Sequence, residues 1–555
     1  GIEYEPRRTY PAGRMAGALL GFADIDGRGR RGIEQMMDEW LRGEPQQLAV
    51  ERDARGRLLG RVAVDPRLAA GGDVVLTLDS GLQAQAEAAL AEVAIRSRSK
   101  TGLVIAVEPK TGDILTLAEW PGFDPNEFRS TPYAQTRSRA FHDALEPGST
   151  IKAFLIAAAL ENETVTARTS IDTGEGWVRI PGKTIRDHHP YGVLDPVGVL
   201  RYSSNVGAIW IGEQLGAQAY HEALTRLGFG RPTKSGFPSE SAGLLRDWQK
   251  WRSVDQATAS FGQGLNVTPI QLAMATAALA NDGQLMQPRL VMARRSALGD
   301  WENQPPRVAG QALDTDSARR VLAMLESVVS AEGTGRRAAL AGIRVAGKTG
   351  TAQHLDSDTG RYSRSRYTAW FVGAAPADDP KVVVVVALEE PRGIHSGGAI
   401  AAPLFATVAT SQLARHGIMT QPEPIPAPAV PTWRVAEEQR MAEKKALAAA
   451  SALAAPAKLA PSRAVSGPPP RRTARARDSR ASVSSADPLR TVLVPDFHGV
   501  SVSSAHRLAA SETLDLHITG AAQGEVIGQA PPAGTVVVGR HRTVQLRVAR
   551  SREGG

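Results

Sequence analysis

The sequence contains no cysteine, which excludes disulfide bonds, thiolate nucleophiles and cysteine-ligated zinc or iron–sulfur sites. This absence is compatible with an oxidising compartment. No run of about 18 apolar residues is present, so no membrane span is predicted. No signal peptide is visible either. The chain begins with Gly1 instead of methionine, which leaves open a lost N-terminal anchor.

The composition is otherwise that of a globular protein, with 42% hydrophobic and 22% charged residues. A length of 555 residues exceeds what one hydrophobic core supports, so we expect several domains. Most of the formal charge of +8 falls in residues 419–490, where Pro, Ala, Arg and Ser dominate. This segment has too little apolar content to repay the entropy of ordering, and we interpret it as a solvated basic linker. A patch for an anionic polymer or lipid is the alternative.

Hydrophobic periodicity predicts a mixture of helices and strands. Near the start of the chain we expect a helix at 32–41 and a hairpin at 51–64. A strand and then a helix, capped by Asp79 or Ser80, are expected within 74–94. The remaining predicted elements are a hairpin turn (110–112), two buried helices (149–161 and 268–283), neighbouring strands (369–376 and 381–391), a closing helix (399–417) and strands around one helix (491–549).

Three short motifs occur in one order along the chain. Ser149 and Lys152 belong to STIK, Ser203 and Asn205 to SSN, and Lys348 opens KTG. Together they match the S-x-x-K, S-x-N and K-T-G set of serine acyl-transferases. Each motif alone is weak evidence, because short patterns recur by chance. The three in this order therefore predict a serine nucleophile with a lysine beside it.

The chemistry explains why these residue types are needed. A serine hydroxyl is a weak nucleophile, and positions i and i+3 of a helix share a face, so Lys152 is expected to reach the Ser149 oxygen. Ser149 follows Glu-Pro-Gly and should open the helix, where backbone amides favour developing anions. A lysine base must be neutral, and burial together with the charge of Lys348 would lower the pKa of Lys152. Ser203 can relay a proton, and Asn205 can hold a peptide carbonyl.

The K-T-G motif is expected to lie on an edge strand and to recognise the end of the substrate. Lys348, Thr349 and Gly350 would bind a terminal carboxylate there. The backbone amides of Ser149 and Thr351 are predicted to form the oxyanion hole, where one donor is typically worth about 3–4 kcal/mol of barrier.

Two further matches are rejected on their context. Ser97 and Lys100 form another S-x-x-K, but Ser97 lies in the basic tail of an amphipathic helix. Lys110 opens another K-T-G, but it lies in the predicted hairpin turn. Residues 342–349 match the phosphate-loop pattern, which requires a helix directly afterwards. The residues that follow are polar and rich in turn formers, so we interpret the stretch as strand and not as a nucleotide site.

The histidines do not predict a metal site. His142, His188 and His189 lack the spacing to a third ligand that metal sites show. No metal and no cofactor is therefore expected for the chemistry.

With these residues in place, the sequence resembles the class B penicillin-binding proteins of the division or elongation type. The resemblance covers nearly the whole chain. The stretches that resemble the N-terminal pedestal of that family are RTYPAG (8–13) and GIEQMMDEWLRG (32–43). Those that resemble its transpeptidase core are RAFHDALEPGSTIKAF (139–154), RYSSNVG (201–207), FGQGLNVTPIQLAMATAALANDG (261–283) and GKTGTAQ (347–353).

The C-terminal part is similar to a single PASTA domain. VPDFHGVSVSSAHRLA (494–509) and VIGQAPPAGTVVVGRHRTVQLRV (526–548) carry that pattern. In this family such modules bind muropeptides or support the enzyme, and we favour a supporting or partner-contact role.

The resemblance implies an α/β (α+β) serine acyl-transferase fold, with a mostly antiparallel sheet flanked by helices. It implies acylation of Ser149 by a D-Ala-D-Ala stem peptide, release of D-alanine, and attack by the amine of a neighbouring stem. It also implies covalent binding of β-lactams, location on the outer side of the cytoplasmic membrane, and no nucleic-acid partner. A membrane glycosyltransferase of the shape–elongation–division group is the implied partner. The expected domains are a pedestal (1–78), a transpeptidase domain (79–418), a linker (419–490) and a PASTA domain (491–550).

Two departures from the family pattern lead us to expect a chain truncated at its start. The membrane anchor and the R-G-x-I-x-D-R stretch that precedes the pedestal are both missing. Three other functions stay open at this point. They are hydrolysis by a β-lactamase or D-alanyl-D-alanine carboxypeptidase, signalling by a non-enzymatic receptor, and ATP binding.

Overall fold

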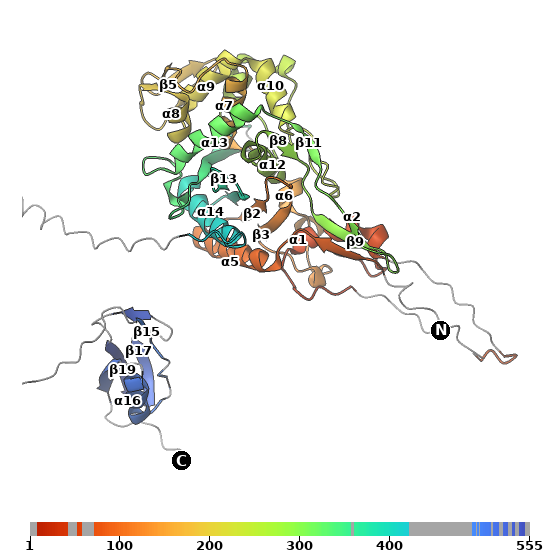
Figure 1. The fold of residues 1–555 in the computed structure, drawn as a ribbon, viewed down its shortest axis with the longest axis vertical. Helices are drawn as coiled ribbons and strands as arrows, with labels where there is room; N and C mark the ends of the chain where they lie inside the picture. Colours follow the sequence, from red (N-terminus) through yellow and green to blue (C-terminus); the bar gives the residue numbers. More distant parts are fainter. Residues whose placement is uncertain are drawn as a thin grey trace, which may run out of the picture. The chain divides into compact units, whose positions relative to one another are not determined.

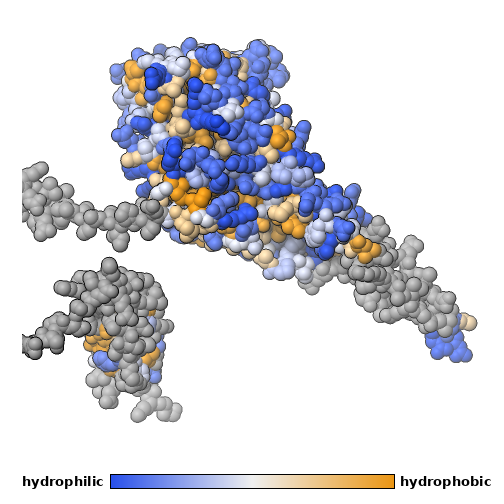
Figure 2. All heavy atoms as spheres, viewed as in Figure 1, coloured by the Kyte–Doolittle hydropathy of each residue, from blue (hydrophilic) through white to orange (hydrophobic). Residues whose placement is uncertain are grey.

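The computed structural model describes residues 8–42, 53–57, 71–356 and 360–420, and most of residues 491–549. The chain divides into two compact units, Gly1–Ala429 and Val430–Gly555, and each is described by itself. The face of the first unit in Figure 2 mixes hydrophilic residues with separate hydrophobic patches, as is normal for a folded surface.

The N-terminal part of the first unit consists of short helices and a small sheet. The expected helix at 32–41 is interrupted, because Met37 has φ −114° and ψ 19° and separates α2 from α3. Of the expected hairpin at 51–64, only the turn 53–57 is described, and the rest lies outside the described residues. The elements are α1 (Gly17–Leu20), α2 (Gly32–Met36), α3 (Asp38–Leu41) and the three-stranded sheet of β1 (Asp73–Leu76), β9 (Val291–Arg295) and β10 (Glu302–Asn303).

A five-stranded antiparallel sheet forms the centre of the first unit (Figure 1). The hairpin turn expected at 110–112 is confirmed, as is the pairing of the two strands expected at 369–376 and 381–391. One edge of the sheet is β12, which carries the K-T-G motif. In order across the sheet, the strands are β12 (Ala346–Leu355), β13 (Tyr362–Ala375), β14 (Val382–Glu389), β2 (Thr101–Val107) and β3 (Ile114–Trp120).

Both faces of this sheet are buried, and the valine run of β14 shows why. Val383 and Val385 belong to one hydrophobic cluster, whereas Val384 and Val386 belong to the other. Because side chains alternate across a strand, a continuous apolar run is what a doubly covered strand needs. Helices α5 (Ser80–Ser97) and α14 (Gly397–Ala414) pack together on one face, and α12 (Pro269–Ala280) covers the other (Figure 1).

Helix starts follow the expected capping chemistry. Asp79 caps α5, since its carboxylate accepts from the amides of Gly81 and Leu82, both at 3.0 Å. Thr268 caps α12 with a capping box, and Pro269 occupies the first turn. These two helices and the closing helix α14 are therefore confirmed as predicted.

Helix α14 passes a length and composition criterion for a membrane span, although it packs on the central sheet. Its mean hydropathy is 1.2, and half of it is buried inside the first unit. It is the one such helix among the described residues. Polar residues near its end, such as Thr410 and Gln412, interrupt the apolar run.

A helical layer lies beyond α12 and carries part of the motifs. The expected buried helix is confirmed, since every residue from Lys152 to Leu160 of α7 is buried. The layer contains α6 (Arg139–His142), α7 (Lys152–Glu161), α8 (Pro196–Arg201), α9 (Asn205–Leu215), α10 (Ala217–Arg226), α11 (Ser253–Ala259) and α13 (Thr315–Val329). Its small ladders pair β4 (Ile171–Asp172) with β7 (Val193–Leu194), β5 (Trp177–Ile180) with β6 (Lys183–Arg186), and β8 (Gln284–Met286) with β11 (Val308–Gln311).

The second unit is a small α+β fold, which confirms the expectation of strands around one helix. Its core contains Val494, Phe497, Ala505, Val544 and Leu546, all nearly inaccessible. Strands β16 (Asp515–Gly520), β19 (Thr543–Ala549) and β17 (Glu525–Ala530) form one sheet, β15 (Thr491–Leu493) pairs with β18 (Val536–Val538), and the helix is α16 (Val502–Ser511).

Candidate active site

Ser149 lies in a tight turn directly before a buried helix. The turn is a 3₁₀ helix, η3 (Gly148–Ile151), and α7 begins at Lys152. We expected Ser149 in the first turn of the α-helix itself. In a 3₁₀ turn, with three residues per turn, positions i and i+3 are eclipsed, so Ser149 and Lys152 still share a side. The Ser149 hydroxyl has no hydrogen-bond partner among the described residues.

Lys152 is fully buried, and its side-chain nitrogen contacts the S-x-N motif. Its Nζ donates to the carbonyl oxygen of Ser203 over 2.6 Å and to Asn205 Oδ1 over 2.8 Å, and it lies 3.4 Å from Ser203 Oγ. The expected hydrogen bond from Lys152 to Ser149 is not among these contacts. In this structure, therefore, Lys152 joins the first motif to the second.

Lys348 approaches the same serine from the edge strand. It is fully buried, and its Nζ donates to Ser203 Oγ over 3.0 Å and to the Thr349 carbonyl over 3.1 Å. Ser203 has φ +60°, a left-handed conformation that is uncommon outside glycine and that clusters at active sites. The hydroxyl of Ser203 thus lies between the amines of two buried lysines.

Burial of the two lysines lowers their pKa values. For Lys152, burial is the main cause, the charge of Lys348 adds to it, and the carboxylate of Asp187 opposes both, with the pKa held well below its ordinary value. For Lys348, burial lowers the pKa to about 7. The prediction that burial and Lys348 depress the pKa of Lys152 is confirmed. A lysine with a lowered pKa is more readily neutral, and a neutral amine on the same side as Ser149 could accept a proton.

Asp187 is a site residue that sequence reasoning missed. It accepts from Ser204 Oγ over 2.5 Å, from the amide of Val206 over 3.2 Å, and from the amide of Asn205. It therefore holds the start of α9, and with it the S-x-N motif, from the end of strand β6. A carboxylate at a helix N-terminus is stabilised by the helix dipole. No sequence signal marks it, because 16 residues separate Asp187 from Ser204.

A cleft of about 480 Å³ opens above the buried lysines. Six of the eight predicted site residues line it, and the other two, Lys152 and Lys348, lie beneath its floor. The predicted residues in its wall are Ser149, Ser203, Asn205, Thr349, Gly350 and Thr351. Lining residues that the sequence analysis did not single out for the site include His188, Gln263, Thr334, Tyr367 and His395.

Gly350 is needed where the edge strand meets the serine turn. A Cβ built on Gly350 would lie 2.9 Å from Thr150 Cγ2 and 3.0 Å from the Pro147 carbonyl oxygen. Any side chain there would push β12 away from η3. Beside it, the hydroxyls of Thr349 and Thr334 lie 2.8 Å apart, which orients Thr349 in the cleft wall.

The rejected matches lie elsewhere in the fold, as predicted. Ser97 is buried at the end of α5, where its hydroxyl donates to the Val93 carbonyl over 2.7 Å. Lys110 lies in the β2–β3 turn and pairs with Asp379 at 3.2 Å. The phosphate-loop match continues as strand β12 to Leu355, so no helix follows it.

The histidines make ordinary contacts. His142 contacts the carbonyl oxygens of Ser138 at 2.6 Å and Pro238 at 3.0 Å. His188 is exposed at the rim of the Ser149 cleft. The described residues contain no group of three side chains that could hold a metal ion.

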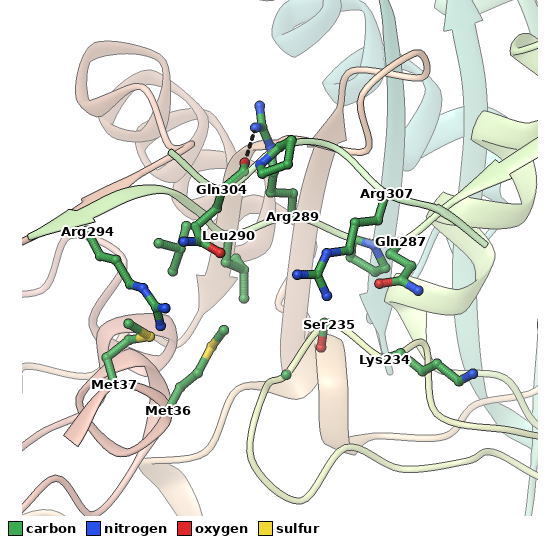
Figure 3. A pocket seen from close by; sticks show the side chains of 14 residues that line it. Met36, Met37, Lys234, Ser235, Gln287, Arg289, Leu290, Arg294, Gln304 and Arg307 are labelled. Atoms are coloured by element: carbon green, nitrogen blue, oxygen red, sulfur yellow. Dashed lines mark hydrogen bonds between the residues drawn. The ribbon is translucent and has the colours of Figure 1, made fainter. Parts of the chain in front are cut away.

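A separate pocket of about 250 Å³ lies where α2 meets the core, between Met36 and the segments around Leu290 and Arg307 (Figure 3). In it, Arg289 donates to the Gln304 carbonyl over 2.6 Å, which is the dashed line in Figure 3. None of the eight predicted site residues lines this pocket, so it is not part of the acyl-transfer site.

Comparisons with known proteins agree with this geometry. A family model for the penicillin-binding protein transpeptidase domain matches residues 102–410, and a PASTA model matches residues 492–550. The chain is 37% identical to a probable peptidoglycan D,D-transpeptidase PenA of Neisseria meningitidis over 78% of this chain and 72% of that protein. It is 34% identical to the peptidoglycan D,D-transpeptidase FtsI of Escherichia coli over 73% of this chain and 67% of that protein.

Two solved structures are also similar. Penicillin-binding protein 3 of Mycobacterium tuberculosis, complexed with aztreonam, matches with a TM-score of 0.66 and 29% identity, over 76% of this chain and 94% of that chain. The transpeptidase domain of Burkholderia pseudomallei penicillin-binding protein 3 matches with a TM-score of 0.55 and 34% identity, over 62% of this chain and 98% of that chain. With the motif residues gathered at one cleft and these likenesses across most of its length, the chain belongs to the penicillin-binding protein transpeptidases.

Proposed function

We propose that this chain cross-links peptidoglycan as a D,D-transpeptidase and that Ser149 forms the acyl-enzyme. The observation that carries the proposal is the convergence of two fully buried lysines, Lys152 and Lys348, on Ser203 beneath the cleft that Ser149 lines. A buried pair of amines costs stability, so its presence at a cleft favours a catalytic use. Membership of the transpeptidase family supports the same reaction.

In the acylation step, the neutral amine of Lys152 takes the proton of Ser149 as its oxygen attacks the carbonyl of the penultimate D-alanine. The C–N bond to the terminal D-alanine breaks, and the leaving amine receives a proton through Ser203. Ser203 suits this relay because its hydroxyl contacts Lys348 at 3.0 Å and lies 3.4 Å from the Nζ of Lys152. Positioned proton transfer of this kind contributes roughly 10²–10⁴-fold to the rate.

Residues in and beneath the walls of the cleft would bind the substrate. Thr349, Gly350 and the charge of Lys348 would hold the terminal carboxylate. An anion beside Lys348 favours its protonated form, which opposes the effect of burial on its pKa. Asn205 would orient a peptide carbonyl, and the backbone amides of Ser149 and Thr351 would hold the oxyanion.

The test of this proposal is acylation by a fluorescent penicillin, followed on a denaturing gel. We expect a stable label on the wild type and on Ser97→Ala, and none on Ser149→Ala. Loss of the label in Ser97→Ala alone, or an unlabelled but folded wild type, contradicts the assignment.

Slow release of the label separates a transpeptidase from a β-lactamase, which hydrolyses the adduct. Release of D-alanine with an acceptor amine separates it from a receptor that is acylated without turnover.

We also propose the domain organisation and setting of the chain. The pedestal comprises residues 1–78, the transpeptidase domain 79–418, the linker 419–490 and the PASTA domain 491–550. The enzyme would act in the cell envelope, on the outer side of the cytoplasmic membrane where its substrate lies. A membrane glycosyltransferase of the shape–elongation–division group would supply the glycan strands, and the PASTA domain would support the enzyme or contact a partner.

A further inference from the structure

We propose that a second cleft, adjoining the Ser149 cleft and lined by Glu146, binds the acceptor stem peptide by its side-chain amine. The inference rests on the proposed transpeptidation, because that reaction needs two peptides at one serine. The donor occupies the cleft that contains the K-T-G motif. The acceptor must then reach the acyl carbonyl on Ser149 from a neighbouring space.

The second cleft has a volume of about 490 Å³, close to the 480 Å³ of the first. Ala352 and Gln353 of strand β12 line both clefts. The two spaces are therefore separated by one short stretch of strand, directly after the K-T-G motif. A peptide in the second cleft can reach toward Ser149 along this shared wall.

Glu146 ties the second cleft to the nucleophile. It precedes Ser149 by three residues, so the two Cα atoms lie at most about 11 Å apart. Glu146 Oε1 accepts from the Gly264 amide and from the Tyr362 hydroxyl, both over 2.8 Å. Glu146 Oε2 is buried and has no hydrogen-bond partner among the described residues. The carboxylate is thus fixed in place, with one oxygen whose charge no donor balances.

The charges around Glu146 favour a cation in the cleft. The charge of Lys183 lowers the pKa of Glu146, but Lys183 forms no ion pair with it among the described contacts. Instead, Lys183 Nζ donates to Gln263 Oε1 over 3.2 Å and lies 5.1 Å from the centroid of the Tyr362 ring. Arg246, also in the wall, is paired with Asp255 at 2.8 Å. Burial raises the pKa of Glu146, because it removes the carboxylate from water, and a cation in the same low-dielectric surroundings would interact with that carboxylate more strongly than in solvent.

The rest of the wall suits the methylene stem of a diamino acid. Leu244 is 48% exposed and Leu355 is 58% exposed, and both line this cleft with the half-buried Leu145. Apolar surface gathered along a cleft, unlike single exposed residues, is typical of ligand-binding grooves. A side chain with several methylene groups and a terminal ammonium matches a wall that combines apolar side chains with a carboxylate.

The chemical step balances with groups already present. The ammonium gives up one proton to solvent and becomes a neutral amine. Its nitrogen attacks the ester carbonyl on Ser149, the new C–N bond forms, and the bond from the carbonyl carbon to Ser149 Oγ breaks. The second proton of the amine passes through Lys152 to Ser149 Oγ. Glu146 is a positioning residue here, since it attracts the ammonium and forms no bond.

The experiment separates acylation from transfer in the full chain. A D-alanyl thioester serves as donor, and a stem peptide with a free diamino-acid side chain serves as acceptor at increasing concentration. Acylation is measured with fluorescent penicillin. The variants are Glu146→Gln, which keeps an oxygen for Gly264 and Tyr362, and the double change Leu244→Ser with Leu355→Ser. Leu298→Ser is the matched control, because Leu298 is also 58% exposed but lies outside both clefts.

We expect each cleft variant to raise the acceptor KM about tenfold, which corresponds to one lost contact or charge interaction, while penicillin acylation stays within about twofold. Leu298→Ser should match the wild type. If the acceptor KM is unchanged in both cleft variants, the acceptor-site proposal is wrong, whereas the transpeptidase proposal is unaffected. An equal loss of acylation and transfer also overturns the acceptor-site proposal, since the role of these residues would then be structural. Absence of acylation in the wild type overturns the transpeptidase proposal itself.

Discussion

The Nζ of Lys348 lies 3.0 Å from the hydroxyl oxygen of Ser203, although the two residues are 145 positions apart in the sequence. This contact and the bonds of Lys152 to Ser203 and Asn205 join all three motifs into one hydrogen-bonded group. The group has no solvent around its lysines, because both are fully buried. A substitution of any residue in this hydrogen-bonded group should therefore alter both proton transfer and the pKa values of the two lysines.

Ser203→Ala removes the hydroxyl between the two amines. Because the relay is lost while the Lys152 bond to the Ser203 carbonyl remains, we expect acylation by penicillin to slow by about 10²-fold. Stopped-flow acylation with a fluorescent penicillin measures this rate. An unchanged rate would remove Ser203 from the proton path. Circular dichroism checks that the variant is folded.

The rate of acylation should depend on pH through the two lysines. Lys152 must be neutral to act as a base, so the rate falls on the acid side as it becomes protonated, with a midpoint far below that of an ordinary lysine. Lys348 must be charged to bind the carboxylate, so kcat/KM falls on the alkaline side of its pKa of about 7. We expect a bell-shaped profile of kcat/KM, and a profile that is flat from pH 5 to 9 would contradict both roles.

Asp187→Asn tests the electrostatic link to Lys152. The Asp187 carboxylate raises the pKa of Lys152, so its removal should lower that pKa further and move the acid limb of the profile to lower pH. Asparagine keeps an oxygen for the amides at the start of α9, and the fold should hold. No shift of the acid limb would show that Asp187 acts only as a cap, and a shift to higher pH would contradict the proposed electrostatic link. The pH profile of acylation is the measurement.

Lys348 should also make stability depend on pH. Its pKa is about 7 in the folded state and ordinarily 10.5, so between these values the unfolded chain binds more protons. Stability then rises with pH, by up to ~1.4 kcal/mol per pH unit from this group. The Lys348→Met variant lacks this contribution. The unfolding free energy of the variant minus that of the wild type should therefore decrease between pH 7 and pH 10. Urea unfolding at both pH values measures it, and a constant difference would contradict the depressed pKa.

Gly350→Ala should separate strand β12 from the serine turn. The new Cβ would clash with Thr150 and the Pro147 carbonyl at about the distances given above, and displacement of the K-T-G strand by even 1 Å can cost about 10²-fold in rate. Gly122→Ala is the control, since its nearest neighbours lie 4.0 Å from a new Cβ. Penicillin acylation of the two variants is compared. Equal acylation rates would show that the serine turn accommodates the new Cβ without displacing the active-site residues.

Much of the fold follows from local pattern. The all-valine stretch of β14 required a strand buried on both faces, and Thr268-Pro269 marked the start of α12. The break at Met37 could not be predicted, because the residues around it include no helix breaker; in the structure Met37 is buried in the main core. The closing helix α14 was predicted from its apolar residues, and its packing on the sheet follows from the same apolar face.

The sequence by itself determined which residues can do chemistry: the order of S-x-x-K, S-x-N and K-T-G, and the local context that excludes Ser97 and Lys110. Only the tertiary structure decided how those residues meet. It placed Ser149 in a 3₁₀ turn, directed Lys152 to Ser203 and Asn205, and brought Asp187 to the start of α9. The reason is physical. Burial and contacts between residues far apart in the sequence set the pKa of a lysine, and neither can be read from a local sequence pattern.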